Sequence, residues 1–368
     1  MLILFNLYGK ESCMSLDLIE SLSNAFGVSG FESEVSDIVR AYAKDFSEIT
    51  SDKMGNVFME FGENKENSVK VLLDAHMDEV GFIVQAIRPN GMIEFLPVGG
   101  WVVNNVPAHT VIIRTEDGKK VKGITASTPP HFMTEVERNA PLTMDALVID
   151  VGTSTKEETE LLGVQIGDPI VPDVKFETLH DDTILLGKAF DCRIGVACLL
   201  DTISTYQKEK INYQISIEGV LTTQEEVGLR GAQVIANNVD ADLAIVFEGC
   251  PADDTFTPEY KIQSALKKGP MLRDFDVSMI THPKFQNYAL NLAKKYGIKV
   301  QRSVRKGGGT NGSAYHLANK GIPTIVVGIP VRYAHTHYGY VAYEDYVSAK
   351  ELVLTILNEL NMDVYNKF

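Results

Sequence analysis

The run VKVLLDAHMDEVGF, residues 69–82, contains the most informative strand of the chain. Its first seven residues, VKVLLDA, are mostly apolar, which is typical of a strand buried on both faces of a sheet. The strand ends at His76 and Asp78, two polar side chains at the edge of an apolar interior. We therefore predict a buried strand that delivers both residues to its carboxyl end.

Outward from this strand, predicted strands alternate with predicted helices. Two amphipathic helices precede it, over residues 15–26 and around Val35–Tyr42. Further along the chain we expect helices at Ile194–Tyr206, Leu229–Ala236, Phe285–Tyr296 and Asp345 to about Leu360, and strands at Ile215–Thr222, Leu243–Phe247 and Thr324–Gly328. Because such alternation builds parallel sheets covered by helices, the predicted fold class is α/β, with a mostly parallel sheet and helices on both faces.

Residues 82–174 have a different texture. They contain short strand-like pieces separated by Gly, Pro, Asn and Asp turns: FIVQAI, MIEFLPV, TVIIRT, KVKGIT, ALVIDV and DPIVP. This pattern predicts a small all-β domain at 82–174, inserted into one discontinuous domain formed by 15–81 and 175–368. Residues 1–14 are expected to be an N-terminal extension.

Composition narrows the classes of protein. The chain has 368 residues, 45% of them hydrophobic and 23% charged, and no apolar run is long enough to span a bilayer. A net charge of −15 disfavours nucleic acid as a partner. The four cysteines (Cys13, Cys192, Cys198, Cys250) lack paired metal-binding spacing, and the start MLILFNLYGKESC lacks the features of a secretory signal. We predict a soluble cytoplasmic protein with neither membrane nor nucleic-acid partners.

Seven side chains at strand ends or helix starts could carry chemistry. They are His76, Asp78, Asp191, Glu225, Glu226, Glu248 and His335. Open α/β sheets gather their ligands at the carboxyl ends of the strands. Two imidazoles with several carboxylates form a donor set suited to Zn²⁺, Co²⁺ or Mn²⁺.

The number of carboxylates suits a site with two metal ions. Ions about 3.5–4 Å apart need a bridging carboxylate, further ligands and a free carboxylate that deprotonates the shared water. Glu225 and Glu226 follow a strand, so their side chains should diverge, one toward metal and the other toward substrate as general base. A metal-bound hydroxide would then attack a peptide carbonyl.

Each residue also has a purely structural interpretation. Asp191 is placed to cap the helix that follows it, Glu248 to occupy a turn, and adjacent glutamates usually form a solvated face. His337 competes with His335 for a ligand role, and we assign it a structural role together with the remaining histidines: His109, His131, His180, His282 and His316. The run Gly307–Thr310 fits either a backbone that approaches a ligand or a flexible loop.

The chain resembles the M42 family of metallo-aminopeptidases from about residue 15 to 360. The segments DAHMDEVGF, the Asp191 segment, QEEVGLRGA, GIPT and RYAHT stand in the family's order. The resemblance implies a zinc-peptidase-like catalytic domain, a PDZ-like insert used in dimer contacts, and homo-oligomers in which dimers assemble to a dodecamer. It also implies that N-terminal residues are removed from peptide substrates.

The resemblance further implies a role for each candidate residue. His76, Asp191 and Glu248 would hold one divalent ion and Asp191, Glu226 and His335 the other, with Asp191 bridging the two. Glu225 would be the general base, and Asp78 would orient His76. Two positions depart from the family pattern: Glu248 stands where relatives often have Asp, and Thr310-Asn311 stands where many have Thr-Asp.

Other functions stay open at this point. An N-acyl-amino-acid deacylase would use the same metals, whereas an endoglucanase, a label some relatives have carried, would leave both histidines idle. A catalytically silent assembly protein would typically have lost the base or a ligand. Basic residues near the expected cleft either favour an acidic first residue of the substrate or are surface charge: Lys267, Lys268, Arg273, Arg302, Arg305 and Lys306.

Overall fold

The computed structural model describes residues 15–61, 68–209 and 211–368. The expected extension, residues 1–14, lies outside these ranges. Among the described residues, no helix is both long and apolar enough to cross a bilayer.

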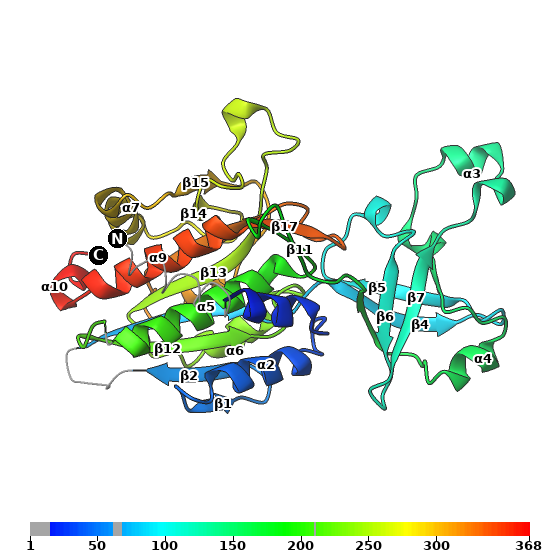
Figure 1. Cartoon of the computed structure of the whole chain (residues 1–368), viewed down its shortest axis with the longest axis horizontal. Helices are drawn as coiled ribbons and strands as arrows, with labels where there is room; N and C mark the ends of the chain where they lie inside the picture. The colour runs from blue at the N-terminus through cyan, green and yellow to red at the C-terminus, as the bar shows by residue number, and fades with distance from the viewer. Residues whose placement is uncertain (1–14, 62–67, 210) are drawn as a thin grey trace.

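An eight-stranded mixed sheet forms the larger body (Figure 1). Its strand order is β1-β2-β12-β3-β13-β16-β14-β15. β12, β3, β13 and β16 run parallel to one another, as do β14 and β15, whereas β1–β2, β2–β12 and β14–β16 pair antiparallel. The strands are β1 Ile49–Ser51, β2 Val57–Phe61, β3 Val69–His76, β12 Ile215–Thr222, β13 Leu243–Pro251, β14 Met271–Phe275, β15 Gln301–Val304 and β16 Thr324–Val331.

Helices cover both faces of this sheet. Alternate side chains of β3 point to opposite faces, so Val71 and Leu73 join one apolar cluster and Leu72 joins the other. The first cluster contains residues of α2 Ser33–Ala43, α5 Phe190–Glu209, α7 Pro283–Tyr296 and α9 Tyr343–Glu359, and the second contains residues of α6 Arg230–Ala236 and α8 Gly312–Tyr315. Full burial of each large apolar side chain contributes roughly 1.5–3 kcal/mol relative to exposure. Residues 15–24 are helical as well, and α10 spans Met362–Tyr365.

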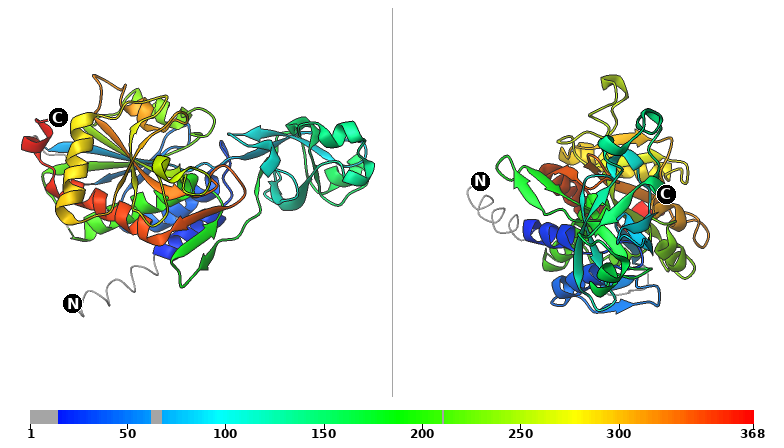
Figure 2. Two further views of the ribbon diagram at one scale, coloured as in Figure 1. Left: turned by 90° about the horizontal axis from the view of Figure 1, so that it is seen from above. Right: turned by 90° about the vertical axis from the view of Figure 1, so that its right-hand side faces the viewer.

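Six strands between residues 81 and 172 close into a separate small barrel. They are β4 Gly81–Ile87, β5 Ile93–Val98, β6 Thr110–Arg114, β7 Lys120–Ala126, β8 Val148–Asp150 and β9 Pro169–Pro172, in the order β4-β5-β8-β7-β6-β9. Its core is its own, formed around residues such as Phe82, Ile113 and Ile149. The short helices α3 Glu135–Asn139 and α4 Lys156–Leu161 lie outside it, and the barrel projects to one side of the sheet body (Figures 1 and 2).

A three-stranded sheet completes the fold, in the order β10 Glu177–Leu179, β11 Ile184–Gly187, β17 Gly339–Ala342. β11 leads directly into the start of α5, and β17 follows the loop after β16. Because β3, β12, β13 and β16 are parallel, their carboxyl ends meet at one edge of the main sheet. Polar residues that follow these strands are therefore brought together.

Candidate metal centre

The predicted site residues come from five segments at that edge. His76 is the last residue of β3, Glu225 and Glu226 lie in the loop after β12, and His335 lies in the loop between β16 and β17. Asp191 stands at the start of α5 with non-helical backbone angles. Glu248 was expected at a strand end but lies inside β13, because pairing with β16 continues as far as Pro251.

Asp191 lies between the two histidines. Its Oδ1 is 3.1 Å from Nε2 of His76, and its Oδ2 is 3.3 Å from Nε2 of His335. Nε2 of His76 is also 3.4 Å from Oε1 of Glu248, and Nε2 of His335 is 3.3 Å from Oε2 of Glu226. The side chains thus form two groups of three that share the carboxylate of Asp191.

The outward nitrogen of each imidazole is held by a neighbouring oxygen. Nδ1 of His76 lies 3.1 Å from the backbone oxygen of Asp78 and 3.4 Å from its Oδ1. Nδ1 of His335 lies 2.9 Å from the backbone oxygen of Gly100, which follows barrel strand β5. If each Nδ1 carries the proton, both Nε2 atoms are left free to face the centre.

The carboxylate of Asp78 faces His76 and also accepts hydrogen bonds from two other segments. It accepts the backbone N–H of Glu225 at 2.9 Å, the backbone N–H of Glu226 at 3.1 Å and the hydroxyl of Ser29 at 2.6 Å. Asp78 is fully buried, yet the His76 ring first, and then the bonds from Ser29 and Glu225, hold the pKa of its carboxyl below the ordinary value despite burial. The residue therefore fixes the loop that carries both glutamates as well as the His76 ring.

A buried ion triad anchors the segments around Asp78 and Asp191. Nζ of Lys188 lies 2.6 Å and 2.7 Å from the carboxylate oxygens of Glu79, and Nη2 of Arg193 lies 3.2 Å from Oε1. Arg193 also donates to the backbone oxygens of Met77, Leu22 and Gly27. In the sequence, Glu79 follows Asp78, and Lys188 and Arg193 stand on either side of Asp191. The triad therefore connects the end of β3 to the start of α5.

Burial and, after it, neighbouring charges shift the pKa values in the centre. Burial raises the pKa of Glu226 to about 8, and the charge of Asp191 acts in the same direction. Burial also raises the pKa of Glu225 well above its ordinary value, and Glu248 and Glu226 add to the effect. Burial opposes protonation of His335, yet hydrogen bonding to Asp191 and the charge of Glu226 raise its pKa to about 10. The centre favours bound positive charge.

The residues fit divalent metal ions. Ligand atoms of His76, Asp191 and Glu226 lie within 4.8 Å of one another, and so do those of His76, Cys192 and Glu248. Oε1 of Glu226 is buried without a hydrogen-bond partner among the described residues, as expected of a ligand atom seen without its cation. Nitrogen and oxygen donors of this kind suit first-row divalent ions.

Two contributors were missed by sequence reasoning. The thiol of Cys192 lies beside His76 and Glu248, a position that its place next to Asp191 could have suggested. In the sequence, only the Gly99-Gly100 pair could have indicated that the Gly100 carbonyl would contact the His335 ring. His337 stacks on His109, with ring centroids 4.1 Å apart, and neither of its ring nitrogens has a hydrogen-bond partner among the described residues. The side-chain amide of Asn311 donates to Asp74 at 2.9 Å and to Thr222 at 2.7 Å.

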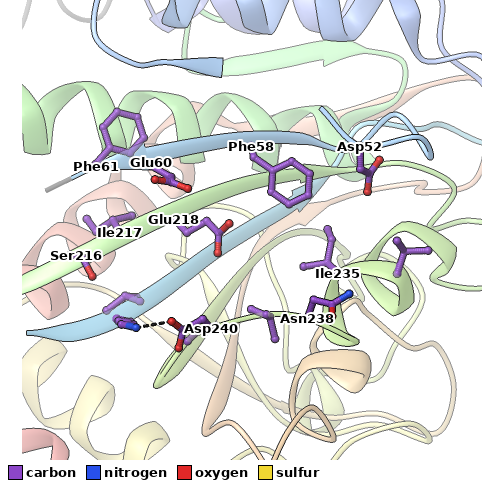
Figure 3. Close-up of a pocket in the computed structure, with 15 residues that line it drawn as sticks. Asp52, Phe58, Glu60, Phe61, Ser216, Ile217, Glu218, Ile235, Asn238 and Asp240 are labelled. Carbon is purple, nitrogen blue, oxygen red and sulfur yellow. Dashed lines mark hydrogen bonds and ion pairs between the residues drawn. The ribbon is translucent and has the colours of Figure 1, made fainter. Parts of the chain in front are cut away.

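A cleft of about 730 Å³ opens onto the centre. Asp191, Glu225, Glu226, Glu248 and His335 line one part of it, and the Gly307–Gly309 run lines another. A second hollow, of about 390 Å³, lies at the amino ends of β3 and β12, where Glu60, Glu218 and Asp240 face it (Figure 3). Among the described residues, no histidine or cysteine lines this second hollow, so the cleft at the carboxyl ends is the candidate active site.

Fold and site together define the class of the protein: a mixed α/β protein with the donor groups of a metal-dependent enzyme. Comparison with known proteins narrows this class. The family model described as M42 glutamyl aminopeptidase matches residues 55–352. The chain therefore belongs to the M42 family, and it is a peptide hydrolase.

Similar proteins extend over nearly the whole chain. The putative aminopeptidase FrvX of Escherichia coli is 35% identical over 96% of this chain and 98% of its own length. A glutamyl aminopeptidase of Lactococcus lactis is 31% identical (94% and 97% covered), and a lysyl aminopeptidase of Pyrococcus furiosus is 29% identical (94% and 97%).

Solved structures are similar over the same extent. The TET aminopeptidase of the marine sediment archaeon Thaumarchaeota archaeon SCGC AB-539-E09 superposes with a TM-score of 0.92 at 37% identity (96% and 99% covered). The TET1 peptidase of Pyrococcus horikoshii, described as assembling into a tetrahedron or a large octahedral shell, has a TM-score of 0.84 at 28% identity (94% and 100%).

Proposed function

We propose that the chain is an aminopeptidase that uses two divalent metal ions to remove single residues from the N-terminus of peptides. The observation that carries the proposal is the pair of three-residue groups that share Asp191. His76, Asp191 and Glu248 would hold one ion, and Asp191, Glu226 and His335 the other. When bound, the ions would supply Lewis-acid activation of water and of the peptide carbonyl.

Glu225 is the proposed general base. Its carboxylate lines the cleft and makes no hydrogen bond or ion pair with any residue in ranges 15–61, 68–209 and 211–368, so it is available to a reactant. Glu225 would take a proton as the water oxygen bonds to the carbonyl carbon, and would return it to the amine as the C–N bond breaks. Asp78 would position Glu225 and Glu226 through their backbone N–H groups.

The metal-binding body, 15–81 and 175–368, and the inserted unit, 82–174, are proposed to be separate domains. We infer that the insert, for which the family resemblance implied a PDZ-like fold, mediates contacts between copies of a homo-oligomer, with dimers assembling to a dodecamer. The support is its projecting barrel with a core of its own, and the shell described for the similar Pyrococcus horikoshii peptidase.

The test is hydrolysis of aminoacyl-p-nitroanilides and a short peptide ladder, before and after chelation, with Zn²⁺, Co²⁺ or Mn²⁺ restored. We expect stepwise N-terminal loss that ends on chelation and returns with metal. Glu225→Gln should lower kcat by roughly 10²- to 10⁴-fold while bound metal is unchanged. Glu218→Gln, in the second hollow, is the matched control.

Other outcomes would replace the proposal. Cleavage of N-acylated substrates alone would indicate a deacylase, and chelator-resistant glucan hydrolysis would indicate a glycosidase. Full activity of Glu225→Gln would remove the base from the mechanism. No cleavage with any metal would leave a silent assembly protein.

A further inference from the structure

The two histidines of the metal centre are supported by different parts of the chain. Both belong to the sheet body, and Nδ1 of His76 faces Asp78 of the same body. Nδ1 of His335 instead lies 2.9 Å from the backbone oxygen of Gly100, which belongs to the insert, 82–174. Of these two contacts, only the one at His335 comes from the inserted unit.

The insert approaches the centre closely at Gly99 and Gly100. Gly99 has a φ of +83°, and a Cβ there would lie 2.7 Å from Cγ1 of Val80 and 3.4 Å from Cβ of Glu226. A Cβ on Gly100 would lie 3.1 Å from Nδ1 of His335. Glycine suits this approach because an added side chain would press on the ring or on the glutamate. The backbone of the insert thus lies directly against the second group of proposed ligands.

His337 anchors the loop that carries His335. Its ring is buried and lies almost parallel to the ring of His109, with centroids 4.1 Å apart and an interplanar angle of 8°. The indole of Trp101 lies beside the same ring, with centroids 5.2 Å apart. Because neither ring nitrogen of His337 has a hydrogen-bond partner among the described residues, ring packing is what holds this side chain.

Trp101 and His109 are themselves fixed to the insert. The indole of Trp101 stacks on Phe82 with centroids 4.6 Å apart, and its Nε1 donates to the backbone oxygen of the first residue of β4 at 3.1 Å. The backbone N–H of His109 donates to Oγ1 of Thr125, in β7, at 3.2 Å. Both rings are therefore tied to barrel strands, and together they form the surface on which His337 packs.

The loop between β16 and β17 has an irregular backbone. Tyr333 and His335 adopt φ values of +62° and +59°. Because the left-handed region is unfavourable for residues with a side chain, such a loop keeps its shape only where surrounding contacts fix it. Through His335 and His337, the insert supplies such contacts on both sides of Thr336.

We propose that the insert positions the imidazole of His335 and thereby sets how tightly one of the two metal ions is held. The positioning residues are Trp101, His109 and His337. The proposal rests on the two-metal function above. The ion proposed at His335 depends on the insert, whereas the ion proposed at His76 depends on the sheet body alone.

The first experiment measures metal binding to the full chain, by calorimetric titration of Zn²⁺ into metal-free protein and elemental analysis after dialysis. The wild-type protein should bind two ions per chain. His337→Ala should weaken one of them by roughly 10- to 100-fold, the usual effect of losing support behind a ligand, and leave the other unchanged. Equal weakening of both ions, or of neither, would overturn the proposal.

Two further variants separate ring packing from other roles of His337. His337→Phe keeps a flat ring, so it should bind both ions as tightly as the wild type does. Loss of the ion in this variant would show that the imidazole nitrogens are needed, and would overturn the packing role. His131→Ala, which truncates an exposed histidine of the insert, is the matched control and should leave both ions unchanged.

A variant on the insert side tests whether the effect crosses between the two units. His109→Ala should weaken the same ion as His337→Ala, and the double variant should lose little more than either single one, because the two rings act through one contact. Losses that multiply would contradict that contact. Since His109 is only partly buried, this variant decides the question even where His337→Ala does not fold.

Failure of the two-metal function would look different. A wild-type chain that binds fewer than two ions would overturn that function and this proposal together. Two ions in the wild type with unchanged binding in the variants would overturn the positioning role alone. At saturating metal, His337→Ala should regain peptide hydrolysis, because the rings act through occupancy of the site; activity that stays low would contradict this.

Discussion

At the scale of single residues, Asp78 joins the two halves of the candidate metal centre. Its carboxylate faces the ring of His76 and accepts the backbone N–H groups of Glu225 and Glu226. An asparagine there would direct an NH₂ group at one of these donors. The site therefore depends on a residue outside the proposed ligands.

We expect Asp78→Asn to weaken metal binding by about 10- to 100-fold, the usual effect of losing a partner behind a ligand. The measurement is competition with a chromogenic chelator. Ser29→Ala is the matched control, because it removes one hydrogen bond to the same carboxylate and should have a much smaller effect. Equal losses in the two variants would contradict this role for Asp78.

Glu32 provides a test of pH dependence. Burial, and then the charge of Asp78, raises its pKa to about 7, and a single oxygen, Oε1, accepts the N–H groups of Gly30 and Gln224. Because the folded state holds this proton more tightly than the unfolded state, the contribution of Glu32 to stability falls as pH rises from about 4.5 to 7. Glutamine keeps an accepting oxygen but does not ionise.

Glu32→Gln should therefore melt near the wild-type temperature at pH 5 and above it at pH 8. The gain at pH 8 should be on the order of 1–3 kcal/mol, since one pKa unit corresponds to about 1.4 kcal/mol. Scanning calorimetry at both pH values measures it, with the exposed Glu48→Gln as control. A gain of the same size at pH 5 would contradict the titration of Glu32.

The types of the candidate ligands could be predicted from the sequence, because metal binding requires particular side chains. His76, Asp191 and His335 stood out because polar side chains followed apolar strands. Their mutual distances were not predictable, nor was the thiol of Cys192 beside them, because spacing along the chain does not report distance in space.

At the scale of elements, β13 and the start of α5 pack so closely that only glycine fits between them. A Cβ at Gly249 would lie 2.4 Å from the backbone oxygen of Phe190 and 2.7 Å from Cα of Asp191. Gly249 adjoins Glu248, so this approach sets the separation of two proposed ligands.

Gly249→Ala should destabilise the fold by about 1–3 kcal/mol and reduce the metal bound per chain, because backbone must move. Thermal melting and elemental analysis check both effects. Gly307→Ala is the control, since a Cβ there would meet nothing within 4 Å. Full metal content in Gly249→Ala would show that the approach is not needed for binding.

Element types followed from periodicity, whereas element ends did not. The predicted strand Ile215–Thr222 coincides with β12. The strand predicted to end at Phe247 continues to Pro251, because a charged residue suggested a strand end while pairing with β16 keeps the backbone extended.

At the scale of the whole molecule, exposed apolar side chains mark the projecting part of the barrel unit. Phe132 and Val136 are 79% and 80% exposed, in and beside α3 (Figure 1). Exposed apolar groups that lie together often mark protein contacts. They fit the proposed role of this unit in assembly.

We expect the wild-type protein to have several times the mass of one chain by light scattering. The double variant Phe132→Asp/Val136→Asp should form smaller particles, because it places charge in a contact surface. Glu135→Gln, on the same helix, should assemble normally. A monomeric wild-type protein would refute the proposed assembly.

The sequence by itself determined the alternation of the central strands with helices, the strand-rich insert and the types of the candidate ligands, because periodicity and side-chain chemistry are local properties; it did not reveal the outer strands β1, β2, β14 and β15. Only the tertiary structure decided which groups meet. His76 and Asp191 are 115 residues apart, and the Gly100 carbonyl and the His335 ring are 235 apart. It also separated Arg273, which lines the cleft, from Arg302, which does not. Parallel pairing in the main sheet, and the contact between the barrel segment at Gly100 and the loop after β16, set these distances, and local spacing in the sequence reports neither.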